Sequence, residues 1–439
     1  MHSYYIICIE VFMKVFIYTL GCKVNQYESQ EMSEILEKQG YEAAGTPDGA
    51  DVIIVNSCTV TAESVRKTRQ AVRHLKKTAP NCVMVLTGCA SQAEPDELRK
   101  LGEVDIFMGN RSDCDIGKAL NTYYNTHARV DAFVPHKTGD AFTGTGITRF
   151  DGHTRAFLKI QDGCDRFCSY CLIPYARGRS RAKTLADIDR ELNALNENGY
   201  TEIVFVGINL SDYGKGTENS LPDALMLAEK YDNIKRVRLG SLEPDHITDE
   251  MIERLGEVTK LCPQFHISVQ SGSDSVLKAM NRHYSAADYE HLAEKLRQTF
   301  KDATITTDML AGFPTETESD VEESIRFIKR VKFEKMHIFP YSVRQGTPAA
   351  KMPQHTNAVK EERAARLAAA AAEIRADFMK AQVGKTVTVL FEAERDGYSE
   401  GYTENYTPVR IYDGTARTGR MIDVSITGYE ADYCTAREL

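Results

Sequence analysis

The sequence of 439 residues contains no tryptophan and no apolar run approaching the roughly 20 residues that a membrane-spanning helix needs. It also has no excess of positive charge, because its formal net charge is −9 at pH 7. A generally basic nucleic-acid-binding surface is therefore excluded, and any such site must be a local patch. The hydrophobic fraction of 42% and the charged fraction of 27% are ordinary for a globular protein, and a chain of this length predicts two or three domains.

The first twelve residues are apolar but contain neither a basic segment nor a small-residue cleavage site, so a secretory signal is not indicated. A clear strand pattern begins only after Met13, and we expect Met13 to be the natural start. Eleven cysteines are many for a chain without such a signal. Because disulfides are rare in the cytosol, we interpret these cysteines as metal or redox residues of a cytoplasmic protein.

The pattern of the chain predicts three domains, with bounds at 13–125, 150–380 and 381–439. In the first, short apolar runs alternate with amphipathic stretches, which predicts an open α/β domain with a parallel sheet. A polar linker at 136–151 precedes a second alternation, whose six β/α units fit an incomplete or full barrel. A long helix at 359–381 leads into a small all-β module, which we expect to be a barrel.

Each region supplies its own candidate elements. The first has strand candidates at Val15–Leu20, Val52–Val55, Val83–Leu86 and Ile106–Met108, and helix candidates at Ser29–Gln39 and Ala62–Lys77. The second has strand candidates at Phe157–Ile160, Ile203–Val206, Arg236–Leu239, Phe265–Val269, Thr304–Met309 and His337–Tyr341. The all-β module has strand candidates at Val387–Phe391, Thr407–Ile411 and Asp423–Tyr429.

Three cysteines lie close together in the sequence Cys164-Asp-Arg-Phe-Cys168-Ser-Tyr-Cys171. Their loop follows the carboxyl end of a predicted strand, where the active sites of β/α barrels lie. A [4Fe–4S] cluster normally has four cysteine ligands, so three thiolates on one loop would leave one iron open. A zinc site is the alternative, but zinc sites usually show two separated ligand pairs, and no second pair lies nearby in the sequence.

Three further cysteines, Cys22, Cys58 and Cys89, each follow a predicted strand of the first region. In a parallel sheet these positions share one edge, at the carboxyl ends of the strands, where ligands bind. Three thiolates at that edge predict a second cluster, again one ligand short. Free cysteines are also common in protein cores, which accounts for Cys82 at the start of its strand. Cys114 is the candidate for a fourth ligand.

The spacing of Cys164, Cys168 and Cys171 resembles the signature of the radical S-adenosylmethionine (SAM) superfamily. The chain from Met13 onward is similar to the methylthiotransferase family of these enzymes, and the matching stretches are Thr19–Ser29, Asn56–Thr61, Thr87–Gln92, Ile160–Arg181, Gly207–Gly214, Ser241–Pro244, His266–Gly272, Met280–Tyr284 and Thr307–Glu316. One departure is Thr315, where the family usually has glycine. The resemblance implies SAM, two [4Fe–4S] clusters on the two cysteine triplets, a radical SAM barrel and a C-terminal TRAM domain.

The first motifs also separate the subgroups of this family. The sequences around Cys22 and Cys58 resemble the subgroup that modifies N6-threonylcarbamoyladenosine at position 37 of tRNA, whereas subgroups acting on isopentenyladenosine or on a ribosomal protein tend to differ after the first cysteine. The resemblance implies transfer of a methylthio group to C2 of the adenine. One SAM would supply the methyl group and another the radical, with electrons from an external donor. The source of the sulfur stays open.

Polar residues at the strand ends of the barrel are candidates for binding SAM or substrate. The candidates are Gly207, Asn209, Ser241, Ser268, Gln270 and Asp308. Gly207 opens a turn after a strand, where a glycine lets the backbone approach a ligand closely. For the polar side chains, the alternative is a satisfied polar group in the layers of the barrel.

Two basic groups are candidates for binding the tRNA anticodon stem-loop. The first group, on one face of a predicted helix, is Arg66, Arg69, Arg73 and Lys76, and the second group, after the Cys171 loop, is Arg177, Arg179 and Arg181. Both groups follow cluster cysteines in sequence, and phosphates favour such local cations. The alternative is a solvated charged helix face.

The C-terminal module has 6 Lys/Arg against 10 Asp/Glu over residues 381–439, although TRAM domains are generally taken to bind RNA. Any RNA contact there must come from a subset of residues: Arg395, Arg410, Arg417, Arg420 and the aromatic residues Tyr398, Tyr402 and Tyr406. A non-catalytic metal-binding RNA module is the alternative from a different functional class.

Overall fold

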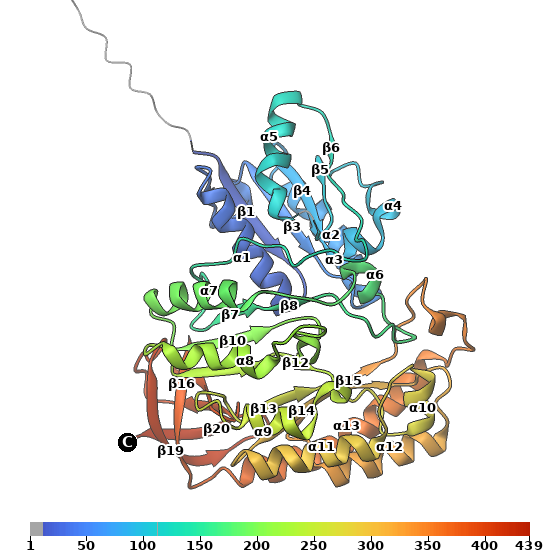
Figure 1. The fold of residues 1–439 in the computed structure, drawn as a ribbon, viewed down its shortest axis with the longest axis vertical. Coiled ribbons are helices and arrows are strands. Elements are labelled where there is room, and N and C mark those ends of the chain that lie inside the picture. The colour runs from blue at the N-terminus through green and yellow to red at the C-terminus, as the bar shows by residue number, and fades with distance from the viewer. Residues whose placement is uncertain (1–11, 112) are drawn as a thin grey trace, which may run out of the picture. The chain divides into compact units, whose positions relative to one another are not determined.

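The computed structural model of the chain describes residues 12–111 and 113–439 (Figure 1). The expectation that residues before Met13 are an extension therefore lies outside the described residues. The chain forms two compact units. One holds the N-terminal sheet as far as Lys137 together with Thr143–Thr145 and Tyr175–Arg177, and the other holds the remainder of the chain to Leu439. No helix of the described residues is long and apolar enough to cross a membrane.

The first unit is built on a six-stranded parallel sheet, as predicted, with the strand order β2-β1-β3-β4-β5-β6. The strands are β1 (Lys14–Thr19), β2 (Glu42–Ala43), β3 (Val52–Ser57), β4 (Val83–Gly88), β5 (Ile106–Phe107) and β6 (Val130–Asp131). The helices are α1 (Lys23–Glu37), α2 (Ala62–Thr78), α3 (Cys89–Ala93), α4 (Pro95–Leu98) and α5 (Ile116–Thr126).

Both faces of this sheet are covered, which explains why its central strands are apolar at every position. Ile53 and Val55 of β3 pack with α2 residues such as Val72 in one hydrophobic cluster. Val52 and Ile54 of the same strand pack with residues of α1 and α5 in a second cluster. Strands buried on both faces read as continuous hydrophobic runs rather than as alternating patterns.

The β/α region of the second unit has seven parallel strands in two sheets, ordered β11-β10-β7 and β12-β13-β14-β15. Its strands are β7 (Ala156–Lys159), β10 (Glu202–Val206), β11 (Arg236–Leu239), β12 (Ser241–Leu242), β13 (Gln264–Ile267), β14 (Thr304–Ala311) and β15 (Lys335–Pro340), and a short hairpin pairs β8 (Gln161–Asp162) with β9 (Arg181–Ala182). No pairing between β7 and β15 occurs among the described strands, so the arrangement is an open barrel.

The helices between and after these strands include α6 (Ile173–Arg177), whose last three residues belong to the first unit. The others are α7 (Leu185–Glu197), α8 (Leu221–Met226), α9 (Asp249–Leu255), α10 (Asp274–Ala279), α11 (Ala286–Thr299), α12 (Glu318–Val331) and α13 (Asn357–Lys380). Capping boxes begin α11 at Ser285 and α12 at Thr317, where hydroxyl and carboxylate groups satisfy the first free N–H groups. Helices α11, α12 and α13 lie side by side (Figure 1).

The C-terminal residues form a closed five-stranded barrel, β16-β17-β18-β20-β19. Its strands are β16 (Thr386–Arg395), β17 (Tyr398–Thr403), β18 (Pro408–Ile411), β19 (Met421–Tyr429) and β20 (Cys434–Glu438). The sequence predicted three of these strands but missed β17 and β20. The inward residues of β17 are Ser399, Gly401 and Thr403, so no apolar alternation marks that strand.

Within the second unit, the barrel docks on the β/α region through buried charges. The Arg238 guanidinium donates to Glu202 at 2.6 Å and to the carbonyl oxygens of Thr403 and Glu404 at 2.7 and 2.6 Å. Tyr402 and Tyr406 stack on each other at 4.4 Å between ring centroids, and Arg238 lies 5.0 Å from the Tyr406 ring. Tyr402 and Tyr406 therefore pack at this interface within the second unit, and an RNA contact by them stays a prediction.

Candidate iron–sulfur and SAM sites

The structure brings together the three cysteines that follow β1, β3 and β4. The pairing of Thr19 with Asn56 and of Asn56 with Thr87 aligns the carboxyl ends of these strands. The Asn25 side chain lies 3.4 Å from the Cys22 sulfur through Oδ1 and 3.9 Å from the Cys89 sulfur through Nδ2. A Cβ placed on Gly21, whose φ is +119°, would lie 3.0 Å from the Cys58 Cβ. All three thiols therefore meet at the predicted edge.

Cys22 holds a special backbone position as the N-cap of α1. The helix begins six residues earlier than the sequence predicted, at Lys23 instead of Ser29. A helix N-terminus carries partial positive charge and favours a thiolate over a thiol. At Cys22, however, burial outweighs this effect and the charge of Arg177, so the pKa of the thiol is raised above its usual value.

A buried arginine contacts the third cysteine of this set. Arg177 Nε donates to the Cys89 sulfur at 3.1 Å, and both terminal nitrogens donate to the Glu28 carboxylate at 2.5 and 3.0 Å. The Arg177 side chain is fully buried. Burial raises the pKa of the Cys89 thiol to about 12, while the positive charge of Arg177 opposes that rise.

The loop of Cys164, Cys168 and Cys171 belongs to the second unit. Ser169 holds its centre, because its N–H donates to Met280 O at 3.0 Å and its own carbonyl accepts from Ala349 N at 2.7 Å. Burial raises the pKa values of Cys164 and Cys171 to about 12 each. These thiols are protonated at neutral pH until a metal displaces the protons.

A second buried arginine contacts this loop. Arg282 Nη1 donates to the Cys168 sulfur at 3.3 Å, and Nη2 donates to the Glu243 carboxylate and to Ser268 O. Arg282 Nε donates to the hydroxyl oxygen of Tyr284 at 3.0 Å. Arg282 and Glu243 lie in motifs quoted above, but neither was predicted as a site residue, because nothing in sequence joins residues so far apart.

The two cysteine sets fit iron–sulfur clusters. Among the described residues, no group of three or more His, Cys, Asp or Glu side chains is arranged to hold a single metal ion. The cysteines of a [4Fe–4S] cluster bind different irons, so their sulfurs need not meet at one point. In each set at least one sulfur also accepts an N–H hydrogen bond from a neighbouring residue, which is a feature of such sites.

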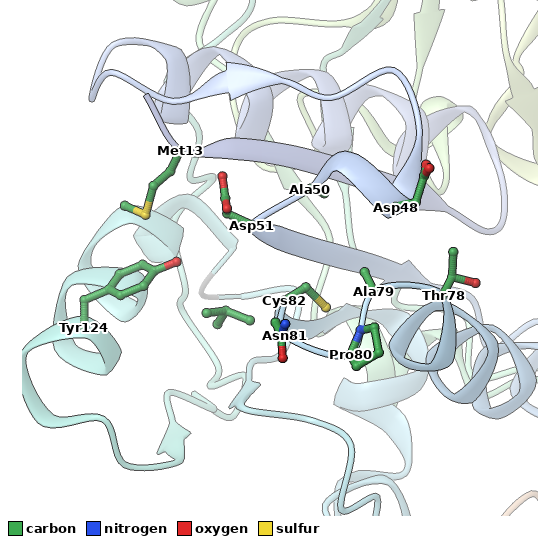
Figure 2. A pocket seen from close by; sticks show the side chains of 11 residues that line it. Met13, Asp48, Ala50, Asp51, Thr78, Ala79, Pro80, Asn81, Cys82 and Tyr124 are labelled. Atoms are coloured by element: carbon green, nitrogen blue, oxygen red, sulfur yellow. The ribbon is translucent and has the colours of Figure 1, made fainter. Parts of the chain in front are cut away.

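Cys114 and Cys82 contact other parts of the first unit. The Cys114 sulfur contacts the Glu31 carboxylate at 3.7 Å. Cys82 lines a pocket of about 340 Å³ at the amino ends of the strands, with Met13, Asp51 and Tyr124 among the other lining residues (Figure 2). Cys82 therefore lies at the edge of the sheet opposite the carboxyl ends of the strands.

Three of the predicted SAM or substrate residues form one polar cluster. Ser241 Oγ lies 3.4 Å from Ser268 Oγ, which donates to Asp308 Oδ2 at 3.2 Å. His266 Nε2 lies 3.2 Å from the same carboxylate oxygen and keeps the pKa of Asp308 below its usual value despite burial. His337 packs beside His266, with the ring centroids 6.1 Å apart. Sequence reasoning missed both histidines.

The remaining predicted residues lie at turns. The N–H groups of Ile208 and Asn209 donate to Gln161 Oε1 at 2.9 and 2.7 Å, which fixes the turn after Gly207. The Asn209 side chain is 1% exposed, yet neither of its polar atoms has a hydrogen-bond partner among the described residues. Buried polar groups are normally paired, so this amide fits a polar ligand. Gln270 has a φ of 67° and its N–H donates to Asp308 O at 2.9 Å.

The turn that contains Thr315 is well held despite its departure from the usual glycine. The Glu316 carboxylate accepts from the Gly312 N–H at 2.8 Å and from Arg363 at 3.0 Å. Gly312, with a φ of +71°, supplies the left-handed conformation that the turn needs. The substitution at Thr315 therefore leaves the turn closed.

Comparison with known proteins identifies the family of the chain. Residues 14–109 match the model described as "Uncharacterized protein family UPF0004", and residues 158–328 match the radical SAM superfamily. The threonylcarbamoyladenosine tRNA methylthiotransferase MtaB of Thermotoga maritima is 39% identical over 88% of this chain and 89% of its own length, and that of Bacillus subtilis is 34% identical over 93% and 92%. The chain belongs to the radical SAM methylthiotransferase family.

Other relatives in this methylthiotransferase family carry a different substrate name. A tRNA-2-methylthio-N(6)-dimethylallyladenosine synthase of Clostridium botulinum is 35% identical over 94% of this chain and 92% of its own length. Among solved structures, the radical SAM methyltransferase TsrM of Kitasatospora setae, with cobalamin and a [4Fe-4S] cluster bound, superposes with a TM-score of 0.59 at 14% identity over 77% of each chain. That likeness concerns the fold alone.

The basic residues on α2 of this methylthiotransferase mostly have acidic neighbours. Arg66 pairs with Glu63 at 2.5 Å, and Arg73 lies 3.7 Å from a Glu103 oxygen. Lys76 donates to Cys82 O at 2.6 Å and pairs with Asp105 at 3.1 Å. Lys76 thus lies at the amino ends of the strands, and Arg69 is half-buried.

The second basic group differs residue by residue. Arg177 is fully buried and offers no surface to a phosphate, so its assignment to the RNA-binding group is not supported by its position. Arg181 is nearly buried and pairs with Asp162 at 2.9 Å. Arg179 is exposed, with its guanidinium 4.7 Å from the Phe167 ring centroid and 3.4 Å from Asp165.

Proposed function

We propose that this chain transfers a methylthio group to C2 of N6-threonylcarbamoyladenosine at position 37 of tRNA, with SAM as methyl donor and radical source. The observation that carries the proposal is the assembly of Cys22, Cys58 and Cys89 at one sheet edge in a chain that also has the Cys164 loop. The first motifs and the 39% identity to the Thermotoga maritima relative support the threonylcarbamoyl substrate.

The chain's own residues have separable tasks in this reaction. Cys164, Cys168 and Cys171 would hold a [4Fe–4S] cluster, which would supply the electron for SAM cleavage. The unpartnered amide of Asn209 and the cluster of Ser241, Ser268 and Asp308 offer hydrogen bonds to polar groups of SAM or of the nucleoside. His266 holds the Asp308 carboxylate in its ionised form. These residues orient the reactants, which is the protein's main contribution in cofactor chemistry.

The partners and location follow from this proposal. The substrate is the anticodon stem-loop of a tRNA, electrons come from an external donor, and the enzyme works in the cytoplasm. Arg66, Arg69 and Arg73 on α2 and Arg179 after the Cys171 loop are the basic residues that we assign to phosphate contacts. The domain bounds 13–125, 150–380 and 381–439 remain our prediction for the three parts.

Anaerobic reconstitution followed by assay on three anticodon stem-loops tests the substrate. The stem-loops carry unmodified adenosine, threonylcarbamoyladenosine or isopentenyladenosine at position 37. We expect about eight irons per chain from two clusters and a methylthio product with the threonylcarbamoyl stem-loop only. Product with the isopentenyl stem-loop alone would instead support the second candidate function, modification of isopentenyladenosine. The 35% identity to the Clostridium botulinum synthase favours this candidate.

A deletion strain provides the complementary measurement in cells. Loss of 2-methylthio-N6-threonylcarbamoyladenosine from bulk tRNA is the expected result, and unchanged levels would refute the substrate. Mass spectrometry of ribosomal proteins from the same strain examines the protein-modifying alternative. A zinc-containing protein that forms no 5′-deoxyadenosine would support the non-catalytic RNA module.

A further inference from the structure

The two cysteine sets, in different units, share a local arrangement. In each set, one sulfur accepts a hydrogen bond from a buried arginine that is also paired with a glutamate. Arg177 joins Cys89 to Glu28, with 3.1 Å between Nε and sulfur. Arg282 joins Cys168 to Glu243, with 3.3 Å between Nη1 and sulfur.

We propose that Arg177 and Arg282 are positioning residues that each set the reduction potential of one iron–sulfur cluster. A cluster with three thiolates becomes more negative when it accepts an electron. A nearby cation and an N–H donor on a ligand sulfur stabilise the reduced form more than the oxidised form, so both raise the reduction potential. The effect is strong where water is excluded, and Arg177 is fully buried while Arg282 is 8% exposed.

A packing role alone does not account for these arginines. Burying an ion pair costs desolvation energy that apolar side chains of similar size avoid, so stability does not require a charge at these positions. Both guanidinium groups are also fixed by several acceptors at once. Arg282 contacts Tyr284, Glu243 and Ser268 O besides its sulfur. Arg177 uses two nitrogens on Glu28 and directs the third to Cys89. The carboxylates therefore aim one N–H at one sulfur.

Substitution of the glutamates tests the direction in which each reduction potential shifts. Arg177→Met removes a positive charge and a donor next to Cys89, so the potential of the N-terminal cluster should fall. Glu28→Gln removes a negative charge but leaves the arginine, so the same potential should rise. A residue that merely supports the fold predicts no such opposite pair of shifts.

The experiment uses the full chain with one cluster present at a time. In one background, alanine replaces Cys164, Cys168 and Cys171. In the other, alanine replaces Cys22, Cys58 and Cys89. Each background is reconstituted anaerobically with iron and sulfide and titrated potentiometrically, with the reduced cluster measured by electron paramagnetic resonance. Iron content is measured on every sample.

We expect Arg177→Met to lower the reduced-to-oxidised ratio of the N-terminal cluster at least tenfold at fixed potential, which equals 59 mV for one electron. The same substitution should leave the reduced-to-oxidised ratio of the other cluster within twofold of the parent value. Arg282→Met should do the reverse, so each variant is the control for the other. Arg177→Lys should shift the ratio less than Arg177→Met, because lysine keeps the charge but not the planar fork.

The inference rests on the two clusters of the proposed function but not on its tRNA substrate, so the two can fail separately. Ratios within twofold of the parent in Arg177→Met and Arg282→Met would overturn it. If the methionine variants lose their iron, the reduction potentials of Glu28→Gln and Glu243→Gln test the proposal instead. A higher potential in these glutamine variants supports the proposal, and an unchanged or lower potential overturns it.

Discussion

The salt bridge between Arg238 and Glu202 makes a quantitative prediction about how the C-terminal barrel is held. Arg238 is 2% exposed in its side chain and Glu202 is 1% exposed. Arg238→Met leaves the carboxylate in place without its nearest cation and removes the donors to the carbonyl oxygens of Thr403 and Glu404. Removing one partner of a buried pair costs about 3–5 kcal/mol.

The expected loss lies at the lower end of that range, because two other cations remain near Glu202. Arg155 lies 3.3 Å and Arg236 lies 4.0 Å from its carboxylate oxygens. We therefore expect Arg238→Met to lower the free energy of unfolding of the second unit by about 3 kcal/mol. Because the carbonyl donors are lost too, the barrel should also become more accessible to protease.

Chemical denaturation and limited proteolysis measure these effects, and a double variant provides the matched control. In Arg238→Met/Glu202→Gln the carboxylate charge is gone, so part of the lost stability should return. A loss below about 1 kcal/mol in the single variant, or a double variant as unstable as the sum of its singles, would refute the electrostatic reasoning.

The same pair predicts a pH dependence with a definite sign. Burial raises the pKa of Glu202, but the charge and hydrogen bond of Arg238, with Arg155 and Arg236, outweigh it and hold the pKa below its usual value. A carboxylate with a lowered folded-state pKa stabilises above its unfolded-state pKa, and that stability disappears as the pH falls through the folded value. The difference in free energy of unfolding between the parent and Arg238→Met should therefore become smaller as the pH falls.

Three further predictions concern single positions. Gly401→Ala should destabilise the C-terminal barrel by about 1–3 kcal/mol in denaturant melts, because the new Cβ would lie 2.3 Å from Leu390 O; a parent-like melt would contradict this. Asn209→Ala should weaken SAM binding about tenfold in equilibrium dialysis without loss of stability, since the Asn209 amide has no hydrogen-bond partner in the described residues. An unchanged affinity would exclude a contact between Asn209 and SAM. Cluster loading should release protons, and its rate should rise between about pH 7 and 9, because burial raises the pKa values of Cys89, Cys164 and Cys171 to about 12. The absorbance of the cluster measures this rate. A pH-independent rate would argue against thiol deprotonation as a limiting step.

The fold was largely predictable because its strands are buried on both faces or alternate regularly. Val52–Val55 and Val83–Leu86 were located correctly from continuous apolar runs. The missed elements have weaker patterns. Strand β17 turns Ser399, Gly401 and Thr403 inward, and the first turn of α1, Lys23-Val-Asn-Gln, has Val24 as its single apolar residue.

The site was predictable only where chemistry marks the residue type. Three cysteines after three strands and the Cys164 loop were visible in sequence, because thiols repeated at matching strand ends are typical of a metal site. Their partners were not visible, since Arg177 and Glu28 lie 149 positions apart and only the fold makes them neighbours. His266 was likewise hidden, because an isolated histidine in a strand carries no signal until Asp308 is seen beside it.

The basic residues show how burial refines a prediction based on charge alone. From the sequence alone, Arg66 and Arg177 are equivalent, because both are cations that follow a predicted cluster cysteine. Arg66 is exposed, and an exposed ion pair such as the one with Glu63 is weak and exchanges readily for a phosphate. Arg177 is fully buried and donates to Glu28 and Cys89, and moving it to an RNA phosphate would leave the buried Glu28 carboxylate without this cation. The contacts of Arg66 are therefore compatible with RNA binding, whereas those of Arg177 commit it to the cluster.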